Sequence, residues 1–268
     1  MVVCGLGLVL LLWVLIVTVL LSQEQRFIFF PTRLLEAQPG MFGLNAEVLR
    51  LASTNGIVLH GWWIHGDGER VLIWYHGNAG NISHRLDNVR ELIRRLGCDI
   101  VLVDYRGYGL SEGTPSEEGL YVDGVTIYDA VAARGFTPES IVLFGQSLGA
   151  SVAVEVALRR RVSGLVLEAA FRSVRAMARS SYPFVPSFLI RTRLDNEQKI
   201  QKIRVPKLIL HGDRDELVPV SHGRLLFELA SPPKRFFVFP GASHNDTYLV
   251  GGSKYFEAWE EFLSETLH

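Results

Sequence analysis

A serine between two glycines is the feature of this chain that points most directly to chemistry. Gly145-Gln146-Ser147-Leu148-Gly149 follows the short apolar run Ile141–Phe144, which is typical of a buried strand. The residues that follow, Ser147–Arg159, are rich in Ala, Val and Leu and predict a helix. A Gly-x-Ser-x-Gly pattern between a strand and a helix is a nucleophile elbow, because only glycines fit beside the serine in so tight a turn. The pattern therefore predicts a nucleophilic serine at Ser147.

A nucleophilic serine needs two partners, and two later segments can supply them. Its hydroxyl reacts poorly at neutral pH unless a base accepts the proton and a carboxylate orients that base. His211–Pro219 contains carboxylates and follows the seventh predicted strand, whereas Gly241–Asp246 contains a histidine and follows the eighth. The carboxyl ends of parallel strands meet at one edge of a sheet, so we expect both loops to reach Ser147. The order serine, acid, histidine is also the one that this kind of elbow uses.

Two further motifs carry a resemblance to a known family. His76–Asn81 has the sequence His-Gly-Asn-Ala-Gly-Asn after the third predicted strand, and Tyr105–Gly109 has Tyr-Arg-Gly-Tyr-Gly after the fourth. Together with the elbow, they make the chain resemble the α/β-hydrolases from about Ala46 to the end. The resemblance is to the branch of membrane-anchored α/β-hydrolase-domain proteins, which are serine hydrolases.

The resemblance implies a role for each member of a catalytic triad. Ser147 is the nucleophile, Asp215 is the acid because it is the second Asp of His-Gly-x-x-Asp, and His244 is the base of a Gly-x-x-His pattern. Two other carboxylates compete for the acid's role. Asp213 lies in the same loop as Asp215, and Glu168 follows the sixth predicted strand, where some relatives carry the acid.

The tetrahedral intermediate of acyl transfer also needs two fixed N–H donors, each typically worth about 3 kcal/mol. The backbone N–H of Leu148 is one, because it lies at the start of the helix after the nucleophile, where the helix dipole adds to the effect. The resemblance places the other donor at Asn78. Gly77 and Gly80 allow that loop to approach the oxyanion closely.

The composition excludes several other classes of function. The chain has 268 residues, with 27 basic against 28 acidic side chains, so no basic face for nucleic acid is expected. The two cysteines, Cys4 and Cys98, do not form a C-x-x-C pair, and no H-E-x-x-H motif occurs. A zinc site therefore has no support. The expected chemistry needs neither a metal nor an organic cofactor.

The chain from about Ala46 onward alternates between apolar runs and helical patterns. Two leading strands without a helix between them, then strand–helix alternation, predict an antiparallel start that leads into a parallel sheet. We expect an α/β-hydrolase fold with a mostly parallel eight-stranded sheet and helices on both faces. The predicted strands are Glu47–Leu51, Val58–Ile64, Val71–Tyr75, Ile100–Val103, Ile141–Phe144, Gly164–Leu167, Lys207–Leu210 and Arg235–Phe239, and the predicted helices are Ser83–Leu96, Glu117–Ala133, Ser147–Arg159, Ser221–Leu229 and Lys254–Leu267.

One long segment interrupts this alternation. Residues 171–204 lie between the sixth and seventh predicted strands, beyond a carboxyl end, where open α/β sheets bind ligands. We predict a small lid whose Tyr182, Phe184 and Phe188 cover an acyl pocket. The alternative is a structural excursion whose aromatic rings simply pack down.

The first residues of the chain form a separate apolar segment. Val2–Leu21 has no charge, and a twenty-residue helix would be roughly 30 Å long, the thickness of a bilayer's hydrocarbon core. A cleaved signal peptide would need a basic start and a small-residue cleavage site, and neither is present. We therefore predict a single-pass membrane anchor at residues 1–22, a juxtamembrane connector at 23–45 and the hydrolase domain at 46–268. The side of the membrane stays open.

These observations together predict a membrane-anchored serine hydrolase. We expect it to cleave carboxylic esters or thioesters of apolar acyl groups through an acyl-enzyme on Ser147. Because relatives include protein depalmitoylases, the resemblance implies a lipid or an acylated protein as substrate. Two alternatives stay open, a serine peptidase of the same fold and a non-catalytic scaffold tethered to a membrane.

Overall fold

The core of the structure is a single eight-stranded sheet. The computed structural model describes residues 2–266, with side chains described from Leu11 onward in the first helix. The strand order is β1-β2-β4-β3-β5-β6-β7-β8. The pairs β1–β2 and β2–β4 are antiparallel and the remaining pairs are parallel, which confirms the predicted α/β-hydrolase sheet. The strands are β1 (Ala46–Ala52), β2 (Val58–Ile64), β3 (Val71–Tyr75), β4 (Asp99–Val103), β5 (Ile141–Gln146), β6 (Gly164–Glu168), β7 (Lys207–Gly212) and β8 (Lys234–Phe239).

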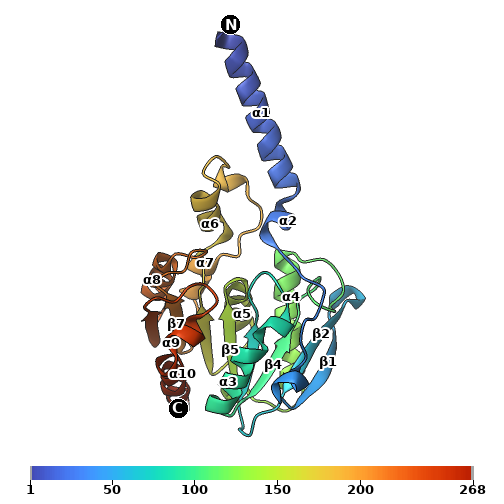
Figure 1. Ribbon diagram of the computed structural model, residues 1–268, viewed down its shortest axis with the longest axis vertical. Coiled ribbons are helices and arrows are strands. Elements are labelled where there is room, and N and C mark those ends of the chain that lie inside the picture. The colour runs from blue at the N-terminus through green and yellow to red at the C-terminus, as the bar shows by residue number, and fades with distance from the viewer. Residues whose placement is uncertain (1, 267–268) are drawn as a thin grey trace.

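Helices cover both faces of this sheet (Figure 1). Successive side chains of a strand point to opposite faces. In β3, accordingly, Ile73 and Tyr75 belong to one buried hydrophobic cluster, whereas Leu72 and Trp74 belong to another. The first cluster is covered by α4 (Glu117–Ala132), α5 (Leu148–Arg159) and α8 (Val220–Leu229), and the second by α3 (Leu86–Leu96) and α10 (Ser253–Glu265).

The segment between β6 and β7 stands over the carboxyl edge of the sheet. It contains α6 (Val174–Ser181), a short 3-10 turn at Ser187–Leu189 and α7 (Asn196–Ile200). Figure 1 shows α6 above the sheet, beside the start of the chain. Glu117 of α4 holds the returning segment, because its carboxylate accepts the backbone N–H groups of Arg193 at 2.6 Å and Leu194 at 2.9 Å.

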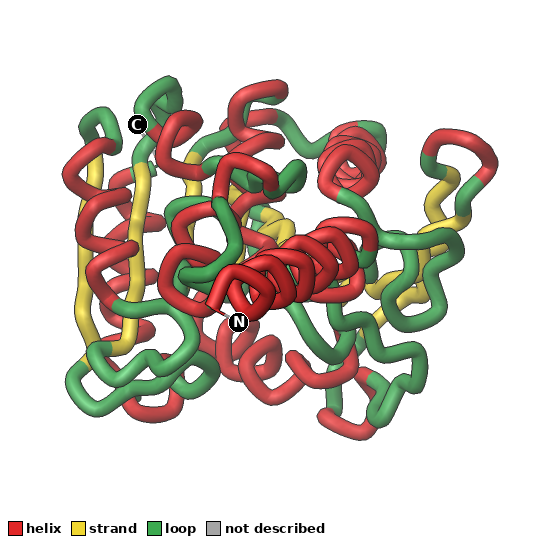
Figure 2. Tube along the Cα trace, turned by 90° about the horizontal axis from the view of Figure 1, so that it is seen from above, coloured by secondary structure: helices red, strands yellow, loops and turns green. Residues whose placement is uncertain are grey.

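Two helices precede the sheet, α1 (Val2–Ser22) and α2 (Glu24–Ile28). In Figure 1, α1 projects from the body, and the view from above shows it over the middle of the molecule (Figure 2). Among the residues that the structure describes, no helix has both the length and the apolar character needed to cross a membrane. The predicted membrane anchor is therefore wrong. Met1, assigned to it, and Leu267, the predicted end of the last helix, lie outside the described residues.

The segment between α2 and β1 packs on the hydrolase body. Phe29 is buried in the same hydrophobic cluster as β3 and α5. Pro31 forms an isolated parallel bridge with Gly80, and the Asn81 side-chain amide donates to the carbonyls of Thr32 and Leu34 at 3.1 and 2.6 Å. This segment is thus part of the wall around the loop that follows β3.

Candidate active site

Ser147 lies in a strained turn between β5 and α5. Its φ is +51° and its ψ −111°, in a region that side-chain-bearing residues rarely adopt. The turn requires a glycine at position 149, because a Cβ there would overlap the backbone of Tyr75 and His76. The Ser147 N–H donates to the carbonyl of Glu168 at 2.9 Å, which ties the turn to the end of β6. The sequence-predicted elbow therefore has a backbone that only this residue pattern can form.

His244 and Asp215 lie beside Ser147 in a continuous chain of hydrogen bonds. His244, in the loop after β8, has its Nε2 3.0 Å from Ser147 Oγ and its Nδ1 2.8 Å from Asp215 Oδ2. With the Nδ1 proton donated to the carboxylate, Nε2 is free to accept the serine proton. All three residues are buried, at 9 %, 5 % and 7 % exposure for Ser147, His244 and Asp215. The structure thus brings the three predicted residues together.

The environment of Asp215 keeps it ionised. Burial by itself raises its pKa, but hydrogen bonds from His211 and His244, together with the backbone N–H of Val218, outweigh that effect and hold the pKa well below its usual range. Its second oxygen accepts the N–H groups of Leu217 and Val218 at 2.9 and 2.7 Å. A carboxylate fixed on both oxygens can orient the imidazole ring and stabilise its protonated form.

The two rival acids have other contacts. Asp213 accepts the backbone N–H of Gly241 at 2.6 Å and so joins the loops after β7 and β8. Glu168 accepts hydrogen bonds from the hydroxyls of Thr247 and Tyr255, each at 2.7 Å, and burial raises its pKa. Neither carboxylate is hydrogen-bonded to His244 within the part of the chain that the structure describes. Asp215 is thus the carboxylate that contacts the imidazole.

The two predicted oxyanion donors border the same space as the nucleophile. Leu148 is the first residue of α5, so its N–H has no partner within the helix. Among residues 2–266, neither this N–H nor that of Asn78 donates to a backbone carbonyl. Asn78 and Leu148 line one cavity with Ser147 and His244. Gly77 lies against the elbow, since a Cβ on it would be 3.5 Å from Ser147 Cβ. Two residues whose N–H groups have no backbone carbonyl partner among the described residues therefore border the same cavity as Ser147.

The side chain of Asn78 has a role that the sequence did not suggest. Its Oδ1 accepts the Tyr108 hydroxyl at 2.8 Å and the Phe30 N–H at 3.0 Å, and its Nδ2 donates to the Ile28 carbonyl at 2.5 Å. Asn78 thus joins the segment before β1 to the Tyr105–Gly109 loop. The sequence held one indication of this contact: the Tyr105–Gly109 motif follows β4, and β4 is the neighbour of β3 in the sheet.

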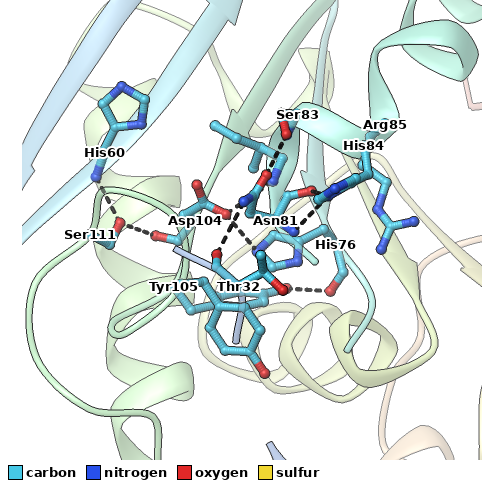
Figure 3. Close-up of polar contacts among 12 residues, drawn as sticks. Thr32, His60, His76, Asn81, Ser83, His84, Arg85, Asp104, Tyr105 and Ser111 are labelled. Carbon is cyan, nitrogen blue, oxygen red and sulfur yellow. Dashed lines mark hydrogen bonds and ion pairs between the residues drawn. The ribbon is translucent and has the colours of Figure 1, made fainter. Parts of the chain in front are cut away.

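A buried polar cluster supports the loop after β3 from below (Figure 3). The Tyr105 hydroxyl donates to the His76 carbonyl at 3.1 Å, and the two rings lie 4.4 Å apart. Asp104 Oδ1 accepts the Ile82 N–H at 3.0 Å and lies 3.5 Å from His76 Nε2. Burial lowers the pKa of His76 to about 3 and raises that of Asp104 to about 8. At neutral pH the histidine is therefore uncharged and its contact with Asp104 is not an ion pair, so the loop is held by the hydrogen bonds of Tyr105 and Ile82.

A cavity of about 510 Å³ opens above Ser147 and His244. This volume lies within the range of roughly 300–1,000 Å³ that small-molecule sites occupy. Its walls come from the N-terminal segment, from residues 171–194 and from the loops at the sheet edge. Among the described lining residues, Glu24 is the one with a carboxylate. The apolar lining residues include Leu20, Leu21, Phe27, Ile28, Phe30, Phe171, Val174, Met177, Val185, Ile190, Leu194 and Leu217.

Only one of the three aromatic residues predicted for the pocket lines it. Tyr182 borders the cavity, but Phe184 and Phe188 do not, and they are 50 % and 74 % exposed. Both lie after the end of α6, on either side of Val185, which does line the cavity. The aromatic walls come instead from Phe27 and Phe30 of the N-terminal segment and from Phe171.

The described residues contain no group of three or more His, Cys, Asp or Glu side chains that could hold a metal ion. A serine hydroxyl hydrogen-bonded to an oriented imidazole, two free N–H donors and an apolar cavity are the components of acyl transfer.

Comparisons with known proteins agree with this geometry. Residues 66–194 match the family described as serine aminopeptidase, S33. The α/β-hydrolase domain-containing protein WAV2 of Arabidopsis thaliana is 32 % identical over 277 residues, covering 93 % of this chain and 90 % of that protein. Protein bem46 of Schizosaccharomyces pombe is 34 % identical over 239 residues, covering 85 % and 79 %. An esterase of Pyrococcus furiosus has a similar fold, with a TM-score of 0.73 at 19 % identity over 90 % of this chain and 98 % of that one. An esterase of Exiguobacterium antarcticum has a TM-score of 0.64 at 19 % identity over 81 % and 99 %.

Proposed function

The chain belongs to the α/β-hydrolase family, and from that premise we propose that it is a serine hydrolase of carboxylic esters or thioesters with apolar acyl groups. One observation carries the proposal: the hydrogen-bonded chain from Ser147 through His244 to Asp215 opens into an apolar cavity. The hydrogen bonds supply the nucleophile, and the cavity supplies a place for the acyl chain.

In the proposed reaction, His244 Nε2 accepts the Ser147 proton while Ser147 Oγ attacks the carbonyl carbon. The N–H groups of Leu148 and Asn78 stabilise the resulting oxyanion. When the tetrahedral intermediate collapses, the bond to the leaving oxygen or sulfur breaks, and that atom takes the proton from His244. Water then attacks the acyl-enzyme by the same route, which releases the carboxylic acid and restores Ser147.

The charge in the cavity favours an acyl substrate over a peptide amino terminus. A site for an α-ammonium group needs a carboxylate that is free to pair with it. The Glu24 carboxylate is occupied, because its two oxygens accept the backbone N–H groups of Thr192 at 2.6 Å and Arg191 at 3.1 Å. An acyl group is therefore better supported than a peptide amino terminus as the occupant of the cavity, although the matched family is described as an aminopeptidase.

The first experiment is labelling with a fluorophosphonate probe, which reacts only with an activated serine. We compare the wild type with Ser147→Ala and with the control Ser151→Ala, one turn further along α5, whose Oγ contacts the Asn196 amide instead of the cavity. Label is expected on the wild type and on Ser151→Ala but not on Ser147→Ala. Turnover of Ser147→Ala should fall by about 10⁶-fold. Labelling that persists without Ser147 contradicts the proposal.

A substrate panel then separates the alternatives. p-Nitrophenyl esters and acyl thioesters of increasing chain length are tested beside aminoacyl p-nitroanilides, which report aminopeptidase activity. The proposal expects Ser147-dependent cleavage of the acyl substrates to exceed that of the anilides by at least tenfold in kcat/KM. Preference for the anilides would favour the peptidase, and no reaction of folded protein with any probe would favour the scaffold.

A further inference from the structure

The end of α1 packs against the segment that covers the cavity. Ala178, Val185 and Ile190 form a small hydrophobic cluster of their own, separate from the two clusters that flank the sheet. Leu20 and Leu21 pack against this cluster. Both leucines also line the cavity above Ser147. One surface of α1 is therefore an apolar wall shared by the cavity and its cover.

Two polar contacts fix the first helices in that place. The Glu24 carboxylate of α2 accepts the N–H groups of Arg191 and Thr192, where the covering segment returns toward the sheet. Further along, the Trp13 ring N–H donates to the Phe184 carbonyl at 3.0 Å. A helix held at both ends of its contact cannot slide along the cavity. The position of Leu20 and Leu21 relative to Ser147 is therefore set by directional bonds as well as by packing.

The wall extends away from the reacting carbonyl. Ile28 lies beside the oxyanion loop, since its carbonyl accepts the Asn78 amide. Leu20 lies eight positions earlier, in α1, on the other side of the break between α1 and α2 at Gln23. Figure 1 shows the same direction, with α2 close to the sheet edge and α1 further from it. A short acyl group at Ser147 would contact Ile28 and Phe30, whereas a long one would extend to Leu20 and Leu21.

We propose that Leu20 and Leu21 of α1 determine which acyl chain length the enzyme prefers. This inference rests on the proposed ester or thioester hydrolysis and names its substrate class as acyl groups long enough to reach the first helix. Specificity then comes from a segment outside the β1–β8 sheet, whereas the chemistry comes from the sheet's carboxyl edge. Burial of each additional methylene group against these leucines contributes to binding through the hydrophobic effect.

The test replaces each leucine and a neighbouring control. Leu20→Trp and Leu21→Trp fill the far part of the cavity, Leu20→Ala enlarges it, and Val19→Trp places the same bulk on the outer surface. Val19 is 49 % exposed and is not a lining residue, so it is the matched control. The readout is the ratio of kcat/KM for p-nitrophenyl dodecanoate to kcat/KM for p-nitrophenyl acetate. Circular dichroism checks that each variant is folded.

The tryptophan and alanine substitutions are expected to change this ratio in opposite directions. It should fall about tenfold in each leucine-to-tryptophan variant, rise in Leu20→Ala and stay at the wild-type value in Val19→Trp. An unchanged ratio in all three leucine variants overturns the inference, while Ser147-dependent ester cleavage leaves the proposed function in place. If neither tryptophan variant of the two leucines folds, the ratio measured in Leu20→Ala decides the test. Ester cleavage that persists in Ser147→Ala overturns the proposed function itself.

Discussion

The catalytic floor and the roof of the cavity are built in different ways. The floor, Ser147, Asp215 and His244, consists of buried polar groups at the ends of strands, joined by hydrogen bonds of 2.8 and 3.0 Å. The roof consists of residues 13–30 and 171–194. Its side chains that line the cavity are mainly apolar, and Trp13 and Glu24 form polar links between its two parts. Hydrogen bonds require one geometry, whereas apolar contacts tolerate several. We therefore expect the two regions to respond differently to substitution.

This contrast predicts that changes in the floor affect turnover and that changes in the roof affect the choice of substrate. The Asn78 side chain belongs to both regions, since it lies in the oxyanion loop and binds Ile28 and Phe30 of the roof. Substitutions in the three places should therefore differ in size and in kind.

The largest effect is expected from the acid of the floor. Asp215→Asn should lower kcat by about 10⁴-fold, because an amide favours the wrong tautomer of His244. Steady-state kinetics with a p-nitrophenyl ester measures the change. Glu168→Gln is the matched control, since Glu168 is buried nearby but bonds Thr247 and Tyr255. It should cost stability, about 1–3 kcal/mol for an imperfectly paired buried group, and much less activity. A larger loss of kcat in Glu168→Gln than in Asp215→Asn would mean that Glu168 is the acid.

An intermediate effect is expected where floor and roof meet. Tyr108→Phe removes one of the hydrogen bonds that hold Asn78, so the oxyanion donor is less well fixed. We expect kcat to fall about tenfold, in line with 1–3 kcal/mol for a lost buried partner, with little change in KM. Affinity for a transition-state analogue such as an alkyl boronic acid should fall in parallel. The control Tyr128→Phe loses a hydroxyl that bonds the Arg161 carbonyl, outside the cavity lining. Equal losses in both variants would mean a general packing effect.

The smallest effect is expected from the polar link in the roof. In Glu24→Gln one oxygen can still accept a backbone N–H, but the charge and the second acceptor are lost. The roof should loosen, and KM for long-chain esters should rise about threefold, as expected for less than 1 kcal/mol. Glu36→Gln is the control, because that exposed carboxylate contacts His84 outside the roof. A tenfold or greater fall in kcat for acetate esters would show that the two regions are not separable.

The sheet and the floor were predictable because local patterns determine them. Apolar runs place the strands, and a loop at the carboxyl end of a parallel strand can lie at only one edge of the sheet. The predicted bounds of β2 and β3 match the structure. The residues predicted as a triad therefore had to lie near one another, although their catalytic roles await the experiments above.

The roof was not predictable, because its contacts join distant parts of the chain. The Glu24–Thr192 hydrogen bond spans 168 positions, and the Asn78–Ile28 bond spans 50. The apolar sequence of α1 predicted a membrane anchor, whereas the structure places Leu20 and Leu21 against a cavity wall. The same limitation affected the aromatic residues of the lid. Their types predicted burial, but Phe184 and Phe188 are exposed.

The Glu24 link joins residues that are synthesised many seconds apart. Glu24 and Arg191 are separated by 167 positions, so at ~5–20 residues per second the carboxylate waits roughly 8–33 s for its partner. His244 leaves the ribosome a further 97 positions after Ser147. A nascent chain therefore has neither its roof nor its base while most of the sheet is already made. The proposed hydrolytic activity therefore requires a chain that has been synthesised at least as far as His244.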